Sequence, residues 1–361
     1  MRILFILELY YPNIGGIEKL FKALAERLVA EGNSVTVITT RFRKDLPCSE
    51  VIEGVRVIRL NISSRFLFTF FGIFGMLKEA RRCDIIHTTS FNAAFPARLA
   101  GWISGKKVII TFHEAWGRLW FRLPYAGFVS KRLYYAYEWF ILRLGFHKFI
   151  AVSDYTAHSL NMLGVKKEKI IRIYNGLDYK DFRQLKHANP GKFTFTYFGR
   201  LGISKGLDII LEAAPSFLER HPDARLKMIF PDHPRGLFRK VTRQISKIPG
   251  DRCRLLHNLS REVLRKELLE SSCVVIPSYS EGFCFAAAEA VAMGIPLISS
   301  GQGALAEVVS GKHITMKSQD KEGLDEALEK AYAGEWEVTE IKEFPFEETV
   351  QAYIKLYLEY S

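Results

Sequence analysis

Short apolar runs rich in β-branched and aromatic residues recur along this chain, and most are separated by stretches with helical periodicity. In the first half these runs cover residues 2–9, 34–40, 55–60, 84–88, 107–112, 148–152 and 170–174. Such an alternation of strand and helix is typical of a parallel sheet that is covered by helices on both faces. It predicts an α/β, doubly wound architecture for this half of the chain.

The alternation restarts after a polar segment, residues 179–192, which contains Asn189-Pro190-Gly191 and is predicted to be a linker. The second series of strands covers residues 193–198, 225–230, 252–256, 273–276 and 296–299, with helices such as 206–218 and 262–269 between them. A chain of 361 residues can bury two separate cores. We therefore expect two Rossmann-like domains, residues 1–180 and 181–345, that face each other across a cleft, with ligands beyond the carboxyl ends of the strands.

A final segment, residues 346–361, follows the last predicted strand too late to be one more crossover helix. Its residues 346–360 form a predicted amphipathic helix, with Val350, Tyr353 and Tyr357 on one face together with Ile354. This helix is expected to be a separate C-terminal element.

The net charge of +12 resides in the first half, where residues 1–180 hold 27 Lys and Arg against 14 Asp and Glu. The five cysteines are scattered without zinc-ligand spacing, which fits a reducing cytosol. No cleavable signal is visible, because the first apolar run is followed at once by Glu8. The most apolar stretch, residues 66–77, is shorter than the roughly 20 residues that span a bilayer. The sequence predicts a cytoplasmic protein that can still contact a membrane surface peripherally.

Two glutamates eight residues apart, Glu281 and Glu289, follow a predicted buried strand. The Ala-rich residues 285–293 predict a helix after a Gly-containing turn, which places Glu281 on the loop and Glu289 inside the helix. A loop carboxylate can accept hydrogen bonds from sugar hydroxyls, and a second one two turns later can bind a diol such as a ribose. Amides at the helix start favour a phosphate. Two solvated acids around a helix start are the alternative interpretation.

Arg200 and Lys205 lie five residues apart in the loop after the first strand of the second half. The planar fork of Arg200 and the point charge of Lys205 can bind a diphosphate and neutralise a leaving group without a metal. No Asp-x-Asp pair is present to hold a catalytic cation, so metal dependence is not expected. The alternative is a pair of solvated loop cations.

Two weaker candidates lie in the first half. Gly15 and Gly16 form a turn after the first strand, where backbone amides can approach a ligand as a helix begins. The turn does not match GxGxxG, which disfavours a nicotinamide cofactor. His113 stands at the carboxyl end of a strand, where it could donate to a substrate hydroxyl or phosphate. A simple strand-to-helix turn and a structural histidine are the respective alternatives.

Between Trp116 and Lys148 the chain interleaves aromatic residues with Arg and Lys. This mixture suits anionic lipid headgroups or a lipid-linked acceptor. Nucleic acid could use the same chemistry, but no binding module for it accompanies the segment, so nucleic acid is not an expected partner. Alternatively, the aromatic residues belong to the core and the cations form its solvated rim.

Taken together, Gly15-Gly16, His113, Arg200 with Lys205, and the Glu-x7-Glu pair resemble the retaining GT-B glycosyltransferases of family four. The resemblance covers nearly the whole chain and is strongest over residues 193–307. It implies that a sugar is transferred from a UDP- or GDP-type nucleotide sugar with the anomeric configuration kept. It implies no cofactor and no metal.

The resemblance also implies a role for each matching residue. Arg200 and Lys205 would bind the diphosphate, Glu281 the hydroxyls of the donor sugar, and Glu289 the ribose. The amides of Gly282 and Phe283 would assist in binding the phosphate. Gly16, together with its neighbour Gly15, would lie near the donor phosphate and the acceptor. His113 would lie beside the transferred sugar. The C-terminal helix would pack back onto the first domain.

One stretch departs from the family pattern. Gly282-Phe283-Cys284-Phe285-Ala286 replaces the more usual Gly-Phe-Gly-Leu-Pro type of sequence, which leaves the choice of donor sugar open. The acceptor is expected to be a glycan or a lipid-linked molecule at a membrane surface. Two other functions stay open on sequence grounds: a nucleotide-sugar epimerase of the same architecture and a nucleotide-sugar-binding protein without turnover.

Overall fold

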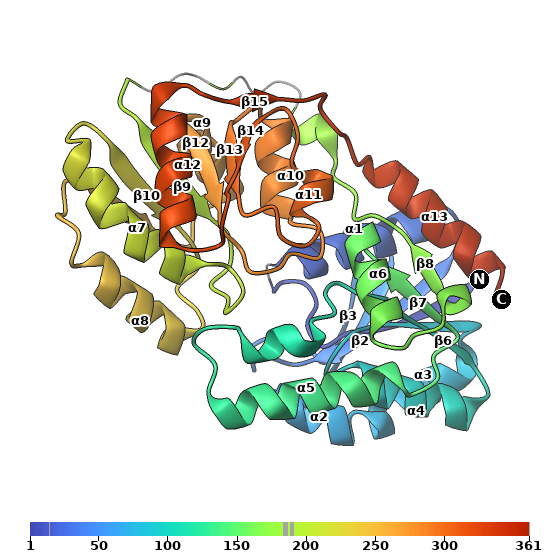
Figure 1. Ribbon diagram of the computed structural model, residues 1–361. Coiled ribbons are helices and arrows are strands. Elements are labelled where there is room, and N and C mark those ends of the chain that lie inside the picture. Colours follow the sequence, from blue (N-terminus) through green and yellow to red (C-terminus); the bar gives the residue numbers. More distant parts are fainter. Residues whose placement is uncertain (14, 183–186, 188–190, 361) are drawn as a thin grey trace. The chain divides into compact units, whose positions relative to one another are not determined.

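The computed structural model describes residues 1–13, 15–182, 187 and 191–360. Its chain forms two compact units, shown in Figure 1. The first unit comprises Met1–Trp120, Val129–Gly176 and Phe346–Ser361, and the second comprises Phe121–Phe128 and Leu177–Pro345. Half of the predicted linker, residues 183–186 and 188–190, lies outside the described residues.

The first unit is built on an eight-stranded sheet with the order β3-β4-β2-β1-β5-β6-β7-β8. Its strands are β1 (Arg2–Ile6), β2 (Ser34–Thr40), β3 (Ser49–Ile52), β4 (Val55–Leu60), β5 (Ile85–Thr89), β6 (Lys107–Phe112), β7 (Lys148–Ala151) and β8 (Ile170–Arg172). All pairs are parallel except β3 with β4, which are antiparallel. Strand order reverses between β1 and β5, and ligands of doubly wound sheets bind at such a reversal.

Helices cover both faces of this sheet. They are α1 (Gly16–Ala30), α2 (Arg65–Phe71), α3 (Ile73–Arg82), α4 (Ala94–Ser104), α5 (Phe128–Leu142), α6 (Asp154–Met162) and α13 (Phe346–Leu358), with short 3-10 turns η1 (Gly117–Phe121) and η2 (Lys167–Lys169). One core layer combines sheet residues with α2 to α6, and the other combines them with α1 and α13. The strands β1, β5, β6 and β7 contribute residues to both layers and are therefore buried on both faces, as their nearly continuous apolar sequences require.

The C-terminal helix α13 packs in the first unit. Val350, Tyr353 and Tyr357 of the predicted apolar face are fully buried, while Ile354 is only partly buried. The Tyr357 hydroxyl lies 2.6 Å from Nδ1 of His87 on β5, and this contact ties the end of the chain to the central sheet. The helix predicted for residues 346–360 is thus confirmed, with its last turn ending at Leu358.

The second unit contains a seven-stranded sheet with the order β11-β10-β9-β12-β13-β14-β15. Its strands are β9 (Thr194–Phe198), β10 (Arg225–Ile229), β11 (Cys253–Leu256), β12 (Cys273–Ile276), β13 (Leu297–Ser299), β14 (Lys312–Thr315) and β15 (Glu337–Val338). Only β15 is antiparallel to its neighbour. Here the order reverses between β9 and β12.

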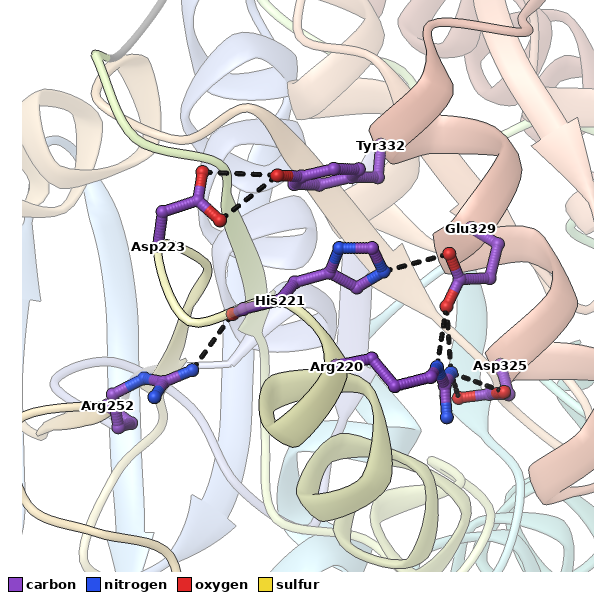
Figure 2. Close-up of polar contacts among 7 residues, drawn as sticks. All are labelled: Arg220, His221, Asp223, Arg252, Asp325, Glu329 and Tyr332. Atoms are coloured by element: carbon purple, nitrogen blue, oxygen red, sulfur yellow. Dashed lines mark hydrogen bonds and ion pairs between the residues drawn. The ribbon is translucent and has the colours of Figure 1, made fainter.

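The helices of this unit flank the sheet, and two of them are also joined by polar contacts. They are α7 (Leu207–Arg220), α8 (Arg235–Ile245), α9 (Arg261–Leu269), α10 (Phe285–Ala292), α11 (Leu305–Val308) and α12 (Lys321–Ala333), with the 3-10 turn η3 (Tyr179–Asp181). Figure 2 shows the polar cluster between the end of α7 and α12. In it Arg220 donates from Nη2 to Asp325 at 2.7 Å and to Glu329 at 2.8 Å.

The predicted doubly wound α/β architecture is confirmed in both halves. Among the described residues, the strands that the sequence does not predict are β3, β14 and β15. The predicted first strand, residues 2–9, is shorter in the structure, because β1 ends at Ile6 and residues 8 and 9 form a bend.

Candidate functional site

Two loops of the second unit meet at the reversal of strand order between β9 and β12. The first runs from Gly199 to Gly206 after β9, and the second follows β12 from Pro277. Gly206 has φ +65°, and a Cβ added there would lie 2.1 Å from the carbonyl oxygen of Pro277. Only glycine can adopt this conformation at such close approach, so the two loops are packed backbone against backbone.

Lys205 and Glu281 form an ion pair across these loops. The Lys205 ammonium lies 2.8 Å from Oε2 of Glu281, and the Ser278 hydroxyl donates to Oε1 at 2.7 Å. Both charged side chains are largely buried. A charge buried in this way requires a partner, since desolvation costs more than an unpaired ion recovers. The structure thus joins two residues that the sequence analysis assigned to different parts of a donor, and it adds Ser278, which that analysis did not single out.

A third loop, after β13, fixes the backbone of Glu281. Gly303 has φ +67°, and a Cβ built on it would lie 2.4 Å from the Glu281 carbonyl oxygen. That same oxygen accepts a hydrogen bond from the amide of Ala304 at 2.8 Å. Gly303 and Ala304 therefore fix the backbone from which the Glu281 carboxylate extends.

Arg200 and Glu289 occupy more open positions in the same unit. The Arg200 side chain is exposed, and its carbonyl oxygen accepts a hydrogen bond from the Tyr197 hydroxyl at 2.9 Å. Glu289 lies within α10 and is partly exposed. Arg200 shares the loop of Lys205, and Glu289 lies on the helix that follows the Glu281 loop, as the sequence predicts. Their roles in binding a ligand stay predictions.

The start of α10 carries an unusual backbone conformation. Cys284, at the N-cap, has φ +72°, a region that favours glycine. Burial, and next the Glu281 carboxylate, raise the pKa of the Cys284 thiol well above its usual value. Phe283 is buried, with its ring 5.3 Å from that of Phe285 and 5.2 Å from that of Phe344. Gly282 is buried beside it, so the amides assigned to a phosphate lie on a well-packed turn.

In the first unit the paired glycines form the turn into α1. A Cβ on Gly15 would lie 2.1 Å from Oε2 of Glu18, because the Glu18 side chain folds back over the turn. Asn13 donates to the other oxygen of Glu18 at 3.0 Å. Gly16 is the first residue of α1 and is partly exposed. A side chain at position 15 would therefore displace the Glu18 carboxylate from the turn, whatever the turn binds.

His113 follows β6 and lies near Phe21 of α1, with 6.3 Å between ring centroids. The carboxyl ends of the neighbouring strands β1 and β5 carry polar residues that the sequence analysis did not assign. Asn92 donates to Oε2 of Glu8 at 2.7 Å, and Arg65 lies 2.8 Å from Oε1 of the same carboxylate. These residues stand at the reversal of strand order, and their position along the strand series is the signal that could have identified them.

The segment between Trp116 and Lys148 contains both buried core residues and exposed aromatic residues. Trp120 is buried, and the carboxylate of Glu138 accepts hydrogen bonds from the amides of Trp116 and Gly117. By contrast, the large apolar residues of the segment that lie exposed are Phe121, Phe128, Val129, Leu133, Trp139 and Phe140. Part of the segment therefore serves the core, and its remainder faces outward.

Two properties concern only the part of the chain that the structure describes. Over residues 1–13, 15–182, 187 and 191–360, no helix has the length and apolar character needed to cross a membrane. Over the same residues, no group of three His, Cys, Asp or Glu side chains is placed to hold a metal ion. Metal independence stays a prediction about the reaction.

Two family models together match most of the chain. The model for Glycosyltransferase Family 4 matches residues 14–181, and that for Glycosyl transferases group 1 matches residues 178–343. Among curated proteins, a human phosphatidylinositol N-acetylglucosaminyltransferase subunit is 24% identical, over 90% of this chain and 67% of its own length. A GDP-mannose:cellobiosyl-diphosphopolyprenol alpha-mannosyltransferase of Xanthomonas oryzae is 26% identical, over 83% of this chain and 78% of its own.

Solved structures show the same fold at lower identity. A sucrose-phosphate synthase from Thermosynechococcus elongatus has a TM-score of 0.78 at 20% identity, with 99% of each chain covered. Anabaena Alr3699/HepE, solved in complex with UDP-glucose, has a TM-score of 0.75 at 15% identity and covers 99% of this chain and 100% of its own. These likenesses confirm the predicted two-domain GT-B fold.

Proposed function

Because the chain belongs to the family 4 glycosyltransferases of GT-B fold, we propose that it transfers a sugar from a UDP- or GDP-type nucleotide sugar to a lipid-linked acceptor. We further propose that the anomeric configuration is kept and that neither a metal nor a cofactor takes part.

The ion pair between Lys205 and Glu281 is the observation that carries the proposal. It lies at the reversal of strand order, where doubly wound sheets bind ligands, and it combines a phosphate-binding cation with a hydroxyl-binding carboxylate. Arg200, on the loop of Lys205, adds a second cation whose exposed side chain can reach a ligand. A sugar attached to a diphosphate presents both kinds of group that this set recognises.

Charge neutralisation is the main chemical step that these residues support. As the bond between the anomeric carbon and the phosphate oxygen breaks, Arg200 and Lys205 stabilise the charge that develops on the departing nucleotide diphosphate. The acceptor hydroxyl attacks the anomeric carbon from the face that the phosphate leaves. Its proton passes to the departing phosphate oxygen, so one bond is broken, one is formed, and no residue becomes covalently attached.

A lipid-linked acceptor is favoured by two findings of different kinds. The names of the two curated relatives refer to phosphatidylinositol and to a diphosphopolyprenol, both of which are lipids. In this chain, exposed aromatic residues of α5 such as Trp139, whose ring lies 4.0 Å from the Arg143 guanidinium, combine apolar surface with positive charge. This part of the segment between Trp116 and Lys148 suits a contact with an anionic membrane surface.

A panel of nucleotide sugars, screened for binding by calorimetry and then for turnover with polyprenyl-phosphate and phosphoinositide acceptors, tests the donor and the acceptor. We expect acceptor-dependent release of UDP or GDP, and a product whose anomeric proton coupling matches that of the donor. Inversion at the anomeric carbon would contradict retention. Loss of activity in EDTA that Mg²⁺ restores would contradict metal independence.

The two other functions give different outcomes in the same assay. A nucleotide-sugar epimerase would convert the donor without an acceptor and would release no nucleotide diphosphate. A binding protein without turnover would bind the donor, and Arg200→Ala would change its affinity only. For a transferase we expect Arg200→Ala to lower kcat by about 100-fold, the effect of removing one preorganised charge-stabilising group.

A further inference from the structure

The helices α2 and α3 are apolar on both sides. Phe68, Ile73, Met76 and Ala80 are buried against the sheet. The opposite side exposes Phe66 by 58%, Leu67 by 51%, Phe70 by 64%, Phe71 by 56% and Phe74 by 77%. We call these five residues the aromatic face. A surface helix of a water-soluble domain normally carries polar residues there, so a second apolar side calls for an apolar partner.

The aromatic face is held in place and is not a poorly packed part of the core. Ser64 caps α2, and Gly72 between the two helices has helical backbone angles, so α3 continues from α2. The Thr69 hydroxyl is bound to the Asn92 side chain at 3.1 Å. A Cβ on Gly75 would lie 2.4 Å from Leu60 of β4, which shows how closely the helix lies on the sheet. With one side fixed in this way, the other cannot turn inward.

The exposed charges within residues 65–82 have one sign. Residues 65–82 expose four cations, Arg65, Lys78, Arg81 and Arg82. Glu79 is the single acid of this stretch; it is buried and lies 3.1 Å from Arg56. Aromatic side chains flanked by Lys and Arg match the interface of an anionic bilayer, where rings enter the headgroup region and each cation contributes roughly 1 kcal/mol.

The start of α2 lies at the edge of the first unit where a ligand is expected. Arg65, its first residue, pairs with Glu8 after β1, and Glu8 in turn accepts a hydrogen bond from Asn92 after β5. Strand order reverses between β1 and β5, so this carboxylate marks the place where doubly wound sheets bind their ligands. The aromatic face begins at the next residue along the chain. A molecule whose lipid part lies along this face would hold its polar end near Glu8.

We propose that the aromatic face of α2 and α3 inserts into an anionic lipid bilayer and delivers a membrane-held acceptor to the Glu8 edge. The inference rests on the proposed function for the nature of the acceptor, and it assigns the bilayer contact to a different element from α5. Figure 1 shows α2, α3, α4 and α5 on the same side of their sheet, and a contact of 5.7 Å between the rings of Phe95 and Phe140 joins α4 to α5. The exposed residues of α5 can therefore widen the contact without being its centre.

Vesicle flotation tests the inference with Phe70→Ser/Phe71→Ser/Phe74→Ser and a matched control, Val338→Ser/Ile341→Ser, which removes exposed apolar residues from the second unit. We expect the wild type and the control to float with vesicles of phosphatidylcholine and phosphatidylglycerol. The Phe variant should partition at least about tenfold less, because each ring contributes apolar area. Phosphatidylcholine alone should bind the wild type more weakly. Equal partitioning of all three proteins would overturn the inference.

Hydrogen-deuterium exchange locates the contact without a substitution. Added anionic vesicles should slow exchange in peptides that cover residues 65–82. Protection confined to residues 128–142 would assign the bilayer contact to α5 and overturn the inference. So would a wild-type dimer that the Phe variant abolishes, if vesicle binding were unaffected. Calorimetric binding of UDP or GDP should be equal in wild type and Phe variant, and its loss in both would count against the proposed function and not against the membrane contact.

Discussion

At the scale of single residues, the Lys205–Glu281 pair allows nucleotide binding and sugar transfer to be separated. Glu281→Gln removes the counter-charge of Lys205, so the affinity for UDP or GDP should stay the same or rise. Turnover should fall by about 100-fold or more, because the sugar loses its carboxylate partner. Calorimetry with the nucleotide and a steady-state assay with the donor check these two expectations. Glu262→Gln, an exposed acid on α9, is the control.

The partner substitution has the opposite signature. Lys205→Met removes the ion pair of the buried Glu281 carboxylate and keeps its hydrogen bond from Ser278. The free energy of unfolding should therefore fall by about 3–5 kcal/mol. Nucleotide affinity should fall as well, since a diphosphate loses a cation. Thermal denaturation and calorimetry measure both effects. Equal losses of nucleotide affinity in the Lys205 and Glu281 variants would contradict the separate roles.

Cys284 permits a stability prediction that does not depend on the ligand. Its φ of +72° costs an L-residue about 1–2 kcal/mol, whereas glycine adopts it readily. Cys284→Gly should therefore raise the free energy of unfolding by about 1 kcal/mol, as measured by urea denaturation. Cys284→Ala keeps the same strained backbone and removes the thiol, so it should give no such gain. A gain in the alanine variant would show that the thiol, and not the backbone, is responsible.

At the scale of elements, the sequence predicts those strands that have parallel neighbours on both sides. β2, β5, β6 and β12 are largely buried runs, and they occur where the apolar pattern places them. The missed strands are polar or very short. β3 alternates exposed and partly buried residues, and both residues of β15 are exposed, because each pairs antiparallel at an edge. Such strands carry no continuous apolar signal.

For the candidate site, the sequence predicts the loops but not the contact between them. Strand-to-helix turns in the sequence locate Arg200, Lys205 and Glu281 on loops, and the structure agrees. The pairing of Lys205 with Glu281 depends on two loops that lie 76 residues apart and are pressed together at Gly206. Long-range packing of this kind leaves no periodic pattern in a sequence, so the pair could not be predicted.

The polar cluster between α7 and α12 in Figure 2 leads to a prediction about how strongly these two helices stabilise each other. Arg220→Ala removes hydrogen bonds to Asp325 and Glu329 on α12. Since these groups are partly exposed, the free energy of unfolding should fall by only about 1 kcal/mol. Urea denaturation of the single variants and of Arg220→Ala/Glu329→Gln measures the coupling energy. Arg239→Ala, an exposed arginine on α8, should change little. If Arg239→Ala lowered the free energy of unfolding by a similar amount, the effect of Arg220→Ala would come from general surface charge and not from the polar cluster.

At the scale of the whole molecule, His87 connects the central sheet of the first unit to the end of the chain. It is fully buried on β5, with Nδ1 2.6 Å from the Tyr357 hydroxyl of α13 and Nε2 2.7 Å from the Thr111 hydroxyl of β6. Burial, and then the charge of His113, lower the pKa of His87 to about 3. The imidazole is therefore neutral in the folded protein at any pH at which the enzyme would be assayed.

This lowered pKa makes the fold sensitive to acid. The unfolded chain binds a proton at His87 below about pH 6.5 and the folded chain does not, so the stabilisation is complete above pH 6.5 and is lost as the pH falls towards 3. Between pH 7 and pH 5 the free energy of unfolding should fall by about 2 kcal/mol through this group alone. Between pH 7 and pH 5 the size of this fall is set by the pKa of His87 in the unfolded chain, because its pKa in the folded protein lies well below pH 5. His87→Gln retains a polar side chain that does not titrate, and the difference between its pH dependence and that of the wild type isolates the contribution. Parallel curves for the two proteins in urea denaturation would show that His87 is protonated within the fold, and that its contacts with Tyr357 and Thr111 do not exclude the charged form.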